Sequence, residues 1–303
     1  VCITSITTCL AMNNTPTDLR LVLIDPKMVE LIRFNGLPHL YGKVETDLER
    51  ITGVLRWCTV EMDRRSVLLQ EERARDLDAY NRKVRRKKGK DPLPRIVVMI
   101  DELADLMLLA PDQTERTLVR LAQMARATGI HLVVATQRPS TDILTGLIKA
   151  NFPGRISFAV ASGVDSRVIL DGPGAETLLG KGDMLYLAPE AAAPVRLQGV
   201  FVDDQEVENL IQSWTENWEL EADAPTEPPW EHLLARQAAL QDKDQVLEQA
   251  IEVVRQSREA SAAGSSPAKT ATSARSSRTF TSALGKLWRS AAKCASCVAL
   301  PTR

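Results

Sequence analysis

Three short apolar runs constrain the fold of this chain more than any other feature of its sequence. They cover Leu19 to Asp25 (LRLVLID), Arg95 to Asp101 (RIVVMID) and His131 to Thr136 (HLVVAT). Continuous apolar runs of this length are typical of strands that are buried on both faces of a parallel sheet. Segments of helical character separate them, so the sequence predicts an α/β fold with a doubly wound, mostly parallel sheet.

Helices are predicted before, between and after these strands. Thr46 to Tyr80 has apolar residues at helical spacing, and Thr46 with Glu49 fits a capping box at its start. The other predicted helices are 1–12, a helix capped by Asp112 or Thr114 that runs to Arg126 and is closed by Gly129, 141–150, and 203–218. Residues 155–160 predict a fourth strand, and 183–187 with 195–202 predict a closing hairpin.

Composition divides the chain into four parts. Its 303 residues carry 38 Lys and Arg against 39 Asp and Glu, a balance that suits a globular protein, and they include no apolar stretch long enough to span a membrane. Residues 1–218 form the predicted domain, 219–245 an acidic linker with three prolines, and 246–259 a short amphipathic helix. Residues 260–303 hold seven basic residues and no acid, and their Ala and Ser content predicts a disordered basic tail.

Polar residues follow the predicted strands at their carboxyl ends, the edge where parallel α/β sheets bind ligands. These residues are Asp25, Asp101, Glu102 and Gln137. Asp101 and Glu102 have the Walker B arrangement, in which the first carboxylate holds Mg²⁺, usually through water, and the second polarises the water that attacks a γ-phosphate. A second interpretation stays open, in which Asp101 caps a helix and Glu102 occupies its first turn.

Five long segments carry a family resemblance. They are IDPKMVEL (24–31), RWCTVEMDRR (56–65), IVVMIDELADLM (96–107), the stretch from ARATGIHLVVATQRPS to NFPGRISF (125–158), and VDSRVILDGPGAETLLGKGDMLY (164–186). They resemble the FtsK/SpoIIIE family of DNA translocases in order and spacing, and the resemblance covers residues 1–218. It implies a RecA-like P-loop NTPase core, ATP and Mg²⁺ as cofactors, a homo-hexameric ring around double-stranded DNA, and ATP-driven translocation in chromosome segregation and cell division.

The resemblance also implies roles for individual residues at the predicted nucleotide site. Asp101 matches the family's Mg²⁺-associated Asp, and Glu102 matches its catalytic Glu. Gln137 matches the residue that senses the γ-phosphate. Asp25 ends the neighbouring predicted strand and is expected with Asp101 among the residues that bind ATP.

Basic residues are the candidates for contacts with a neighbouring subunit's ATP and with DNA. Arg155 resembles an arginine presented in trans, where it would stabilise charge on the transferring phosphoryl group, with Arg167 as an alternative. Arg155 could equally be a surface residue at the start of a strand. Arg138 and Lys149 are, by position, the candidates for lining the pore through which DNA passes. The run from Arg82 to Lys90 is either a solvated helix end or a sequence-independent phosphate contact.

One element of the family is absent from the 303 residues, the Gly-rich loop that ends in Gly-Lys-Ser/Thr and cradles the triphosphate. Residues 1–12 resemble the helix that follows this loop. We therefore expect a cytoplasmic fragment that binds ATP weakly and hydrolyses it negligibly on its own. Membrane contact is expected only through an N-terminal segment of a parent protein at the bacterial inner membrane. Residues 246–259 resemble the first helix of the family's winged-helix domain, after which the resemblance stops.

Two classes of function remain open on this sequence. The first is an ATP-driven DNA translocase motor, present here as a fragment that is inactive alone. The second is a non-catalytic DNA-binding or ring-assembly module, such as a degenerate paralogue or remnant, because one α/β fold serves many functions. The Gly-rich loop separates the two classes, since a motor needs it and an assembly module does not.

Overall fold

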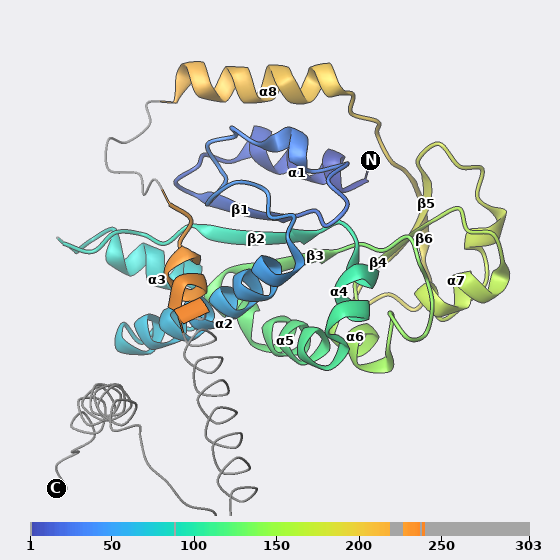
Figure 1. The fold of residues 1–303 in the computed structure, drawn as a ribbon, viewed down its shortest axis with the longest axis horizontal. Coiled ribbons are helices and arrows are strands. Elements are labelled where there is room, and N and C mark those ends of the chain that lie inside the picture. The colour runs from blue at the N-terminus through green and yellow to red at the C-terminus, as the bar shows by residue number, and fades with distance from the viewer. Residues whose placement is uncertain (1, 88, 219–226, 237, 240–303) are drawn as a thin grey trace, which may run out of the picture. The chain divides into compact units, whose positions relative to one another are not determined.

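The computed structural model describes residues 2–87, 89–218, 227–236 and 238–239 (Figure 1). The predicted helix at 246–259 and the predicted basic tail at 260–303 lie outside the described residues. Most of the predicted linker lies outside them as well.

A three-stranded parallel sheet forms the centre of the domain, as the apolar runs predict. Its strands are β1 (Leu19–Ile24), β2 (Arg95–Ile100) and β3 (Ile130–Val134), in the order β1-β2-β3. Ile24 pairs with Ile100, and Ile100 pairs with Val134, so the three strands end level with one another. The register therefore delivers the residues after each strand to a single edge of the sheet.

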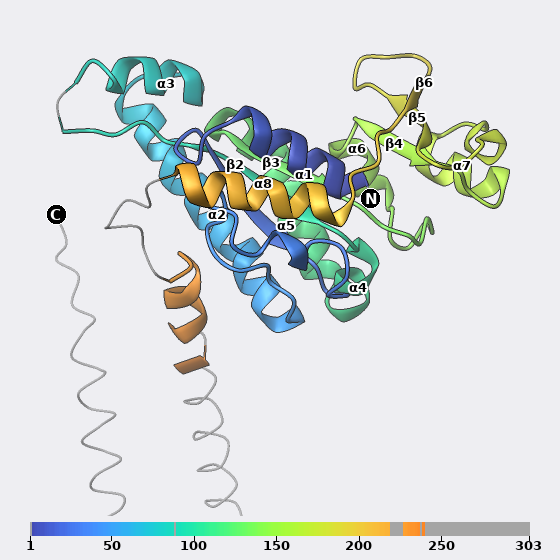
Figure 2. The ribbon, with the colours of Figure 1, turned by 90° about the horizontal axis from the view of Figure 1, so that it is seen from above.

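Helices cover both faces of this sheet, which confirms the α/β class (Figures 1 and 2). The helices α2 (Leu48–Glu71) and α5 (Pro111–Met124) lie on one face, and α1 (Cys2–Asn13) and α8 (Asp204–Asn217) lie on the other. Alternate strand residues fill the two cores. Val22, Ile24, Ile96, Val98 and Ile100 belong to the first core, and Leu21, Leu23, Val97 and Met99 belong to the second. Burial on both faces explains why the strands read as continuous apolar runs.

The helix predicted from Thr46 to Tyr80 is in fact two helices, and its predicted cap is wrong. α2 ends at Glu71, and α3 (Leu77–Val84) begins after a break in which Arg73 has a φ of 49°. The N-cap of α2 is Asp47, whose carboxylate accepts a hydrogen bond from the backbone N–H of Arg50 at 2.9 Å. A left-handed residue cannot continue an α-helix, so the break divides the apolar pattern that suggested one helix.

Other helix starts also differ from the sequence predictions. α5 begins at Pro111 with Ala110 at its N-cap, because proline suits the first turn of a helix, so neither Asp112 nor Thr114 is its cap. α6 (Gly146–Asn151) begins later than predicted, with Thr145 as its N-cap.

The described residues also contain four short helices, which are α4 (Leu103–Leu109), η1 (Ile32–Phe34), η2 (Ala125–Thr128) and η3 (Ala175–Thr177). The predicted stop at Gly129 is confirmed, since it adopts a φ of 75° after η2.

The fourth predicted strand exists but does not join the parallel sheet. β4 (Arg155–Phe158) pairs antiparallel with β5 (Asp183–Leu187), which pairs with β6 (Val195–Gln198) in a second sheet. The predicted hairpin is thus confirmed, and β4 extends it. Leu185 and Leu187 of β5 pack with Leu170 of α7 (Gly163–Leu170), so this small sheet has its own core.

A buried arginine joins α2 to the segments that precede β2 and β3. Arg65 is fully buried, and its guanidinium donates to Oε1 of Glu61 at 2.7 Å and to the carbonyls of Pro94 at 2.7 Å and Thr128 at 3.1 Å. Arg64 donates to the same carboxylate at 2.7 Å, but its side chain is 52% exposed. The two arginines share one partner and differ in burial.

We expect Arg65→Met to lower the free energy of unfolding by about 3 kcal/mol or more, because it leaves one buried carbonyl, one partly buried carbonyl and part of a carboxylate unpaired. The matched change Arg64→Met should cost less than about 1 kcal/mol, since water replaces an exposed partner. Urea unfolding followed by circular dichroism measures both. Equal losses for the two variants would show that the buried contacts of Arg65 add nothing to stability.

Candidate nucleotide site at the carboxyl edge of the parallel sheet

The polar residues predicted for the nucleotide site lie together where the three parallel strands end. Asp25 follows β1, Asp101 and Glu102 follow β2, and Gln137 follows β3. Backbone hydrogen bonds continue beyond the strands, from the N–H of Asp101 to the carbonyl of Ile24 at 3.0 Å and from that of Leu103 to Ala135 at 2.8 Å. The edge therefore keeps the register of the sheet as far as the site.

Asp25 and Asp101 each present a buried carboxylate oxygen without a hydrogen-bond partner in the described part of the chain. Oδ2 of Asp25 accepts the backbone N–H groups of Val29 at 3.0 Å and Leu31 at 2.8 Å, which leaves Oδ1 free. Burial, and then the nearby charge of Asp25, raise the pKa of Asp101 to about 6. Two buried acidic oxygens that repel each other form a place that a cation would stabilise.

Glu102 is buried and fully engaged. Its carboxylate accepts Nζ of Lys27 at 2.7 Å, Oγ1 of Thr136 at 2.5 Å, and the backbone N–H groups of Gln137 and Ala104, each at 3.2 Å. Burial raises the pKa of Glu102, but the hydrogen bonds from Lys27, Thr136 and Gln137 outweigh it and hold the pKa below its usual value. The carboxylate is therefore ionised, and its hydrogen-bonding positions are occupied.

The alternative interpretation of these two acids is partly correct, with the roles exchanged. The N-cap of α4 is Glu102, whose carboxylate accepts the N–H of Ala104, and Asp101 is not the cap. Capping thus explains one of the hydrogen bonds to Glu102. It explains neither the contacts from Lys27 and Thr136 nor the unpartnered oxygen of Asp101.

Lys27 and Thr136 were not among the residues predicted for the site. Lys27 lies in the turn after β1, where Met28 has a φ of 57° that L-residues seldom adopt. Its position two residues beyond Asp25, in the IDPKMVEL segment, was the available signal. Thr136 carried no signal, because its role depends on a hydrogen bond to a residue 34 positions earlier.

The predicted basic residues lie on other elements. Arg155 begins β4, and its guanidinium donates to the carbonyl of Ile169 at 3.0 Å and to the carboxylate of Asp171 at 2.7 Å. Lys149 of α6 also pairs with Asp171, and these two hydrogen bonds lower the pKa of that carboxyl. Arg167 donates to the carbonyl of Gly163 at 3.3 Å, and Arg138 is exposed. None of these contacts reaches Asp25, Asp101 or Glu102.

The donor set at this edge fits a magnesium ion that arrives with a phosphate ligand. Within the described residues, no group of three or more His, Cys, Asp or Glu side chains is placed to hold a metal ion. Mg²⁺ commonly takes one or two carboxylates, keeps several waters and completes its shell with substrate phosphates. The free oxygens of Asp25 and Asp101 meet that smaller requirement.

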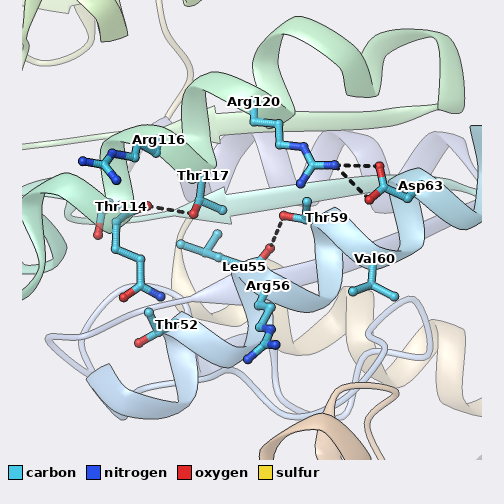
Figure 3. A pocket seen from close by; sticks show the side chains of 11 residues that line it. Thr52, Leu55, Arg56, Thr59, Val60, Asp63, Thr114, Arg116, Thr117 and Arg120 are labelled. Atoms are coloured by element: carbon cyan, nitrogen blue, oxygen red, sulfur yellow. Dashed lines mark hydrogen bonds and ion pairs between the residues drawn. The ribbon is translucent and has the colours of Figure 1, made fainter. Parts of the chain in front are cut away.

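A separate hollow of about 370 Å³ lies between α2 and α5 (Figure 3). None of the residues predicted for the nucleotide site lines it. Its lining is mainly threonine and arginine, and a hydrogen-bonded pair of Arg120 with Asp63 crosses it at 2.9 and 3.0 Å. Thr59 and Thr117 use their hydroxyls on carbonyls of their own helices. The hollow therefore presents no buried polar group that lacks a partner.

The parallel sheet, its helical layers and the acids at its carboxyl edge define the fold class of this chain as that of the P-loop NTPases. Solved structures support this class. The conjugation coupling protein TcpA of pCW3, in its monomer form with ATPγS, has a TM-score of 0.60 at 28% identity over 69% of this chain and 61% of TcpA. The secretion ATPase EccC of Thermomonospora curvata has a TM-score of 0.60 at 24% identity over 70% of this chain and 26% of EccC.

Residues 1–141 match the FtsK/SpoIIIE family, and the chain belongs to this family. DNA translocase FtsK of Caldanaerobacter subterraneus is 46% identical over 86% of this chain and 36% of its own length. DNA translocase SftA of Bacillus subtilis is 46% identical over 84% of this chain and 26% of its own length. The chain thus spans about a third or less of these relatives. Among the described helices, none has the length and apolar character needed to cross a membrane.

The raised pKa of Asp101 predicts a pH-dependent stability. An acid with a folded pKa near 6 and an ordinary value of 3.8 adds stability below about pH 4, and this is lost as the pH rises through 6. We therefore expect Asp101→Asn to stabilise the chain at pH 7.5 by up to about 3 kcal/mol, with little gain at pH 4. Chemical denaturation at both pH values measures this difference, with the exposed Asp112→Asn as control. A gain that is the same at both pH values would contradict the raised pKa.

Proposed function

We propose that this chain is the motor segment of an ATP-driven double-stranded DNA translocase that serves chromosome segregation and cell division. One observation carries the proposal, namely the two unpartnered buried oxygens of Asp25 and Asp101 beside Glu102, in a chain that belongs to the FtsK/SpoIIIE family. The relatives' names describe DNA translocases, and one related structure contains ATPγS. These names support ATP and DNA as the ligands of this chain.

The side chains at the carboxyl edge of the parallel sheet would have different roles in ATP hydrolysis. Asp25 and Asp101 would hold Mg²⁺, which when bound neutralises charge on the phosphates. Glu102 would polarise the attacking water, for which one of its oxygens must lose a present donor. Lys27 is the donor best able to leave, because its side chain is 31% exposed while that of Glu102 is fully buried. Gln137 is exposed, its backbone N–H donates to Glu102, and it would sense the terminal phosphate.

Assembly and DNA contact complete the proposal. We propose a homo-hexameric ring in which Arg155, or Arg167, reaches the ATP of the neighbouring copy. Arg155 would have to exchange Asp171 for that phosphate. Arg138 and Lys149 would contact the DNA backbone rather than bases, because a motor that moves along any sequence cannot depend on base readout. The parent protein would be anchored at the bacterial inner membrane with this segment in the cytoplasm, and residues 246–259 would begin a winged helix.

The full engagement of Glu102 keeps a second function open. A carboxylate whose positions are filled by Lys27, Thr136 and two backbone N–H groups activates no water as it stands. A non-catalytic DNA-binding or ring-assembly module would keep this arrangement permanently. The two functions differ in nucleotide binding, since only the motor needs the free oxygens of Asp25 and Asp101.

We expect the 303-residue chain to bind fluorescent ATPγS weakly and only with Mg²⁺, since the carboxylate edge contributes through the cation. Asp101→Ala should weaken Mg²⁺-dependent binding by about tenfold or more, as loss of a metal-site carboxylate does. Fluorescence anisotropy with Mg²⁺ and with EDTA measures this, and the exposed Asp112→Ala is the control. Equal binding in EDTA would overturn the assignment, and DNA binding without any nucleotide binding would favour the assembly module.

A second test locates the DNA contact. If Arg138 and Lys149 each neutralise a phosphate, the double variant Arg138→Ala, Lys149→Ala should reduce the slope of log affinity against log salt by about 2. The matched pair Arg82→Ala, Arg86→Ala, in the basic run that begins in the last turn of α3, should leave the slope unchanged. Titration of a labelled random-sequence duplex between 50 and 200 mM salt measures both. A slope change with the second pair alone would move the DNA contact to the basic run.

A further inference from the structure

Residues 227–236, here called the strap, lie against the described core although their prolines predicted a linker. Trp230 is 1% exposed, and its indole N–H donates to Oε1 of Glu45 at 2.7 Å. Its ring meets that of Trp57 on α2 edge to face, with centroids 5.5 Å apart. A buried tryptophan with its N–H paired is the usual form of a specific anchor.

Three charged side chains form ion pairs next to Trp230. Arg50 donates to both oxygens of Glu45, at 2.9 and 3.0 Å, and to Glu231 of the strap at 2.8 Å. These hydrogen bonds raise the pKa of Arg50 further above its usual range. The side chains of Arg50 and Glu231 remain 39% and 36% exposed. The attachment thus combines one buried indole, the packing of Leu233 and Leu234 against the core, and a half-exposed ion pair. A contact of this size can open locally.

Two glycines shape the surface that receives the strap. A Cβ on Gly42 would lie 2.6 Å from Cγ of Pro228, and a Cβ on Gly53 would lie 2.2 Å from Cδ2 of Leu234. Neither glycine has a positive φ, so the local backbone does not require them. Their absent side chains instead provide the space that the strap occupies.

The receiving surface is joined directly to the candidate nucleotide edge. The backbone N–H of Glu45 donates to the carbonyl of Leu23 at 3.0 Å, and its carbonyl accepts the N–H of Asp25 at 2.9 Å. The carboxylate of Asp25 in turn holds the turn that carries Lys27, through the N–H groups of Val29 and Leu31. One residue, Glu45, therefore touches the strap with its side chain and the site with its backbone.

We propose that the strap is a removable docking element and that its attachment holds the Asp25 turn in the arrangement seen here. When Trp230 leaves, Glu45 and Arg50 lose a partner each, and the bridge between Glu45 and Ile24 loosens. Detachment of the strap would then alter the Asp25 turn at the candidate ATP site. The inference rests on the proposed function only in naming this edge as an ATP site.

Amide hydrogen exchange of the nucleotide-free 303-residue chain tests the proposal. We expect Trp230→Ala to speed exchange in residues 42–45 and in residues 25–31 by about tenfold or more, because both depend on the attached strap. Gly42→Ala should do the same without removing any contact atom, since its Cβ blocks Pro228. Trp218→Ala is the control for the loss of a tryptophan. Gly146→Ala is the control for the added Cβ, which at Gly146 meets no atom within 4 Å.

A synthetic peptide of residues 227–236, added in excess to the Trp230→Ala chain, should restore protection in residues 25–31, and the same peptide with alanine for tryptophan should not. Faster exchange confined to residues 42–45 would overturn the coupling and leave a local anchor. Rapid exchange of residues 231–236 in the unaltered chain would overturn docking itself. No nucleotide is present, so failure here is separable from failure of ATP binding, which the anisotropy titration reports.

Discussion

The aligned ends of the parallel strands are the constraint on which the rest of the structure depends. Because Ile24, Ile100 and Val134 lie in register, the residues that follow them converge on one edge. Two of these residues are aspartates whose buried charges repel, and the pKa of Asp101 rises to about 6 as a result of burial and of Asp25. The strands thus hold the carboxylate of Asp101 close to the charge of Asp25, an arrangement typical of sites that bind a cation.

Glu102, the residue proposed for catalysis, is fully hydrogen-bonded at the same edge. Glu102 closes the N-terminus of α4 and accepts hydrogen bonds from Lys27, Thr136 and Gln137. These contacts stabilise the charged carboxylate and occupy the oxygens that would bind water. The proposed catalytic role of Glu102 and its observed capping role are therefore compatible, because the carboxylate would become available to water if Lys27 moved away.

Some features could be predicted from the sequence because their cause is local. The apolar runs predicted β1, β2 and β3, the Walker B pattern predicted Asp101 and Glu102, and Gly129 marked a stop that needs a positive φ. Other features depend on distant partners. The break before α3, the antiparallel pairing of β4 and the burial of Trp230 leave no periodic signal, and proline content even suggested a linker where Trp230 is buried.

The sequence by itself determined the class of fold, the family and the acids at the strand ends, because strand burial and motif spacing are written in consecutive residues. Only the tertiary structure decided which groups those acids meet. Lys27 and Thr136 reach Glu102 across 75 and 34 positions, and Trp230 reaches Glu45 across 185. The residues next to each of these side chains in the sequence do not determine which distant partner it contacts. These hydrogen bonds therefore stabilise the chain only after packing brings the distant segments together.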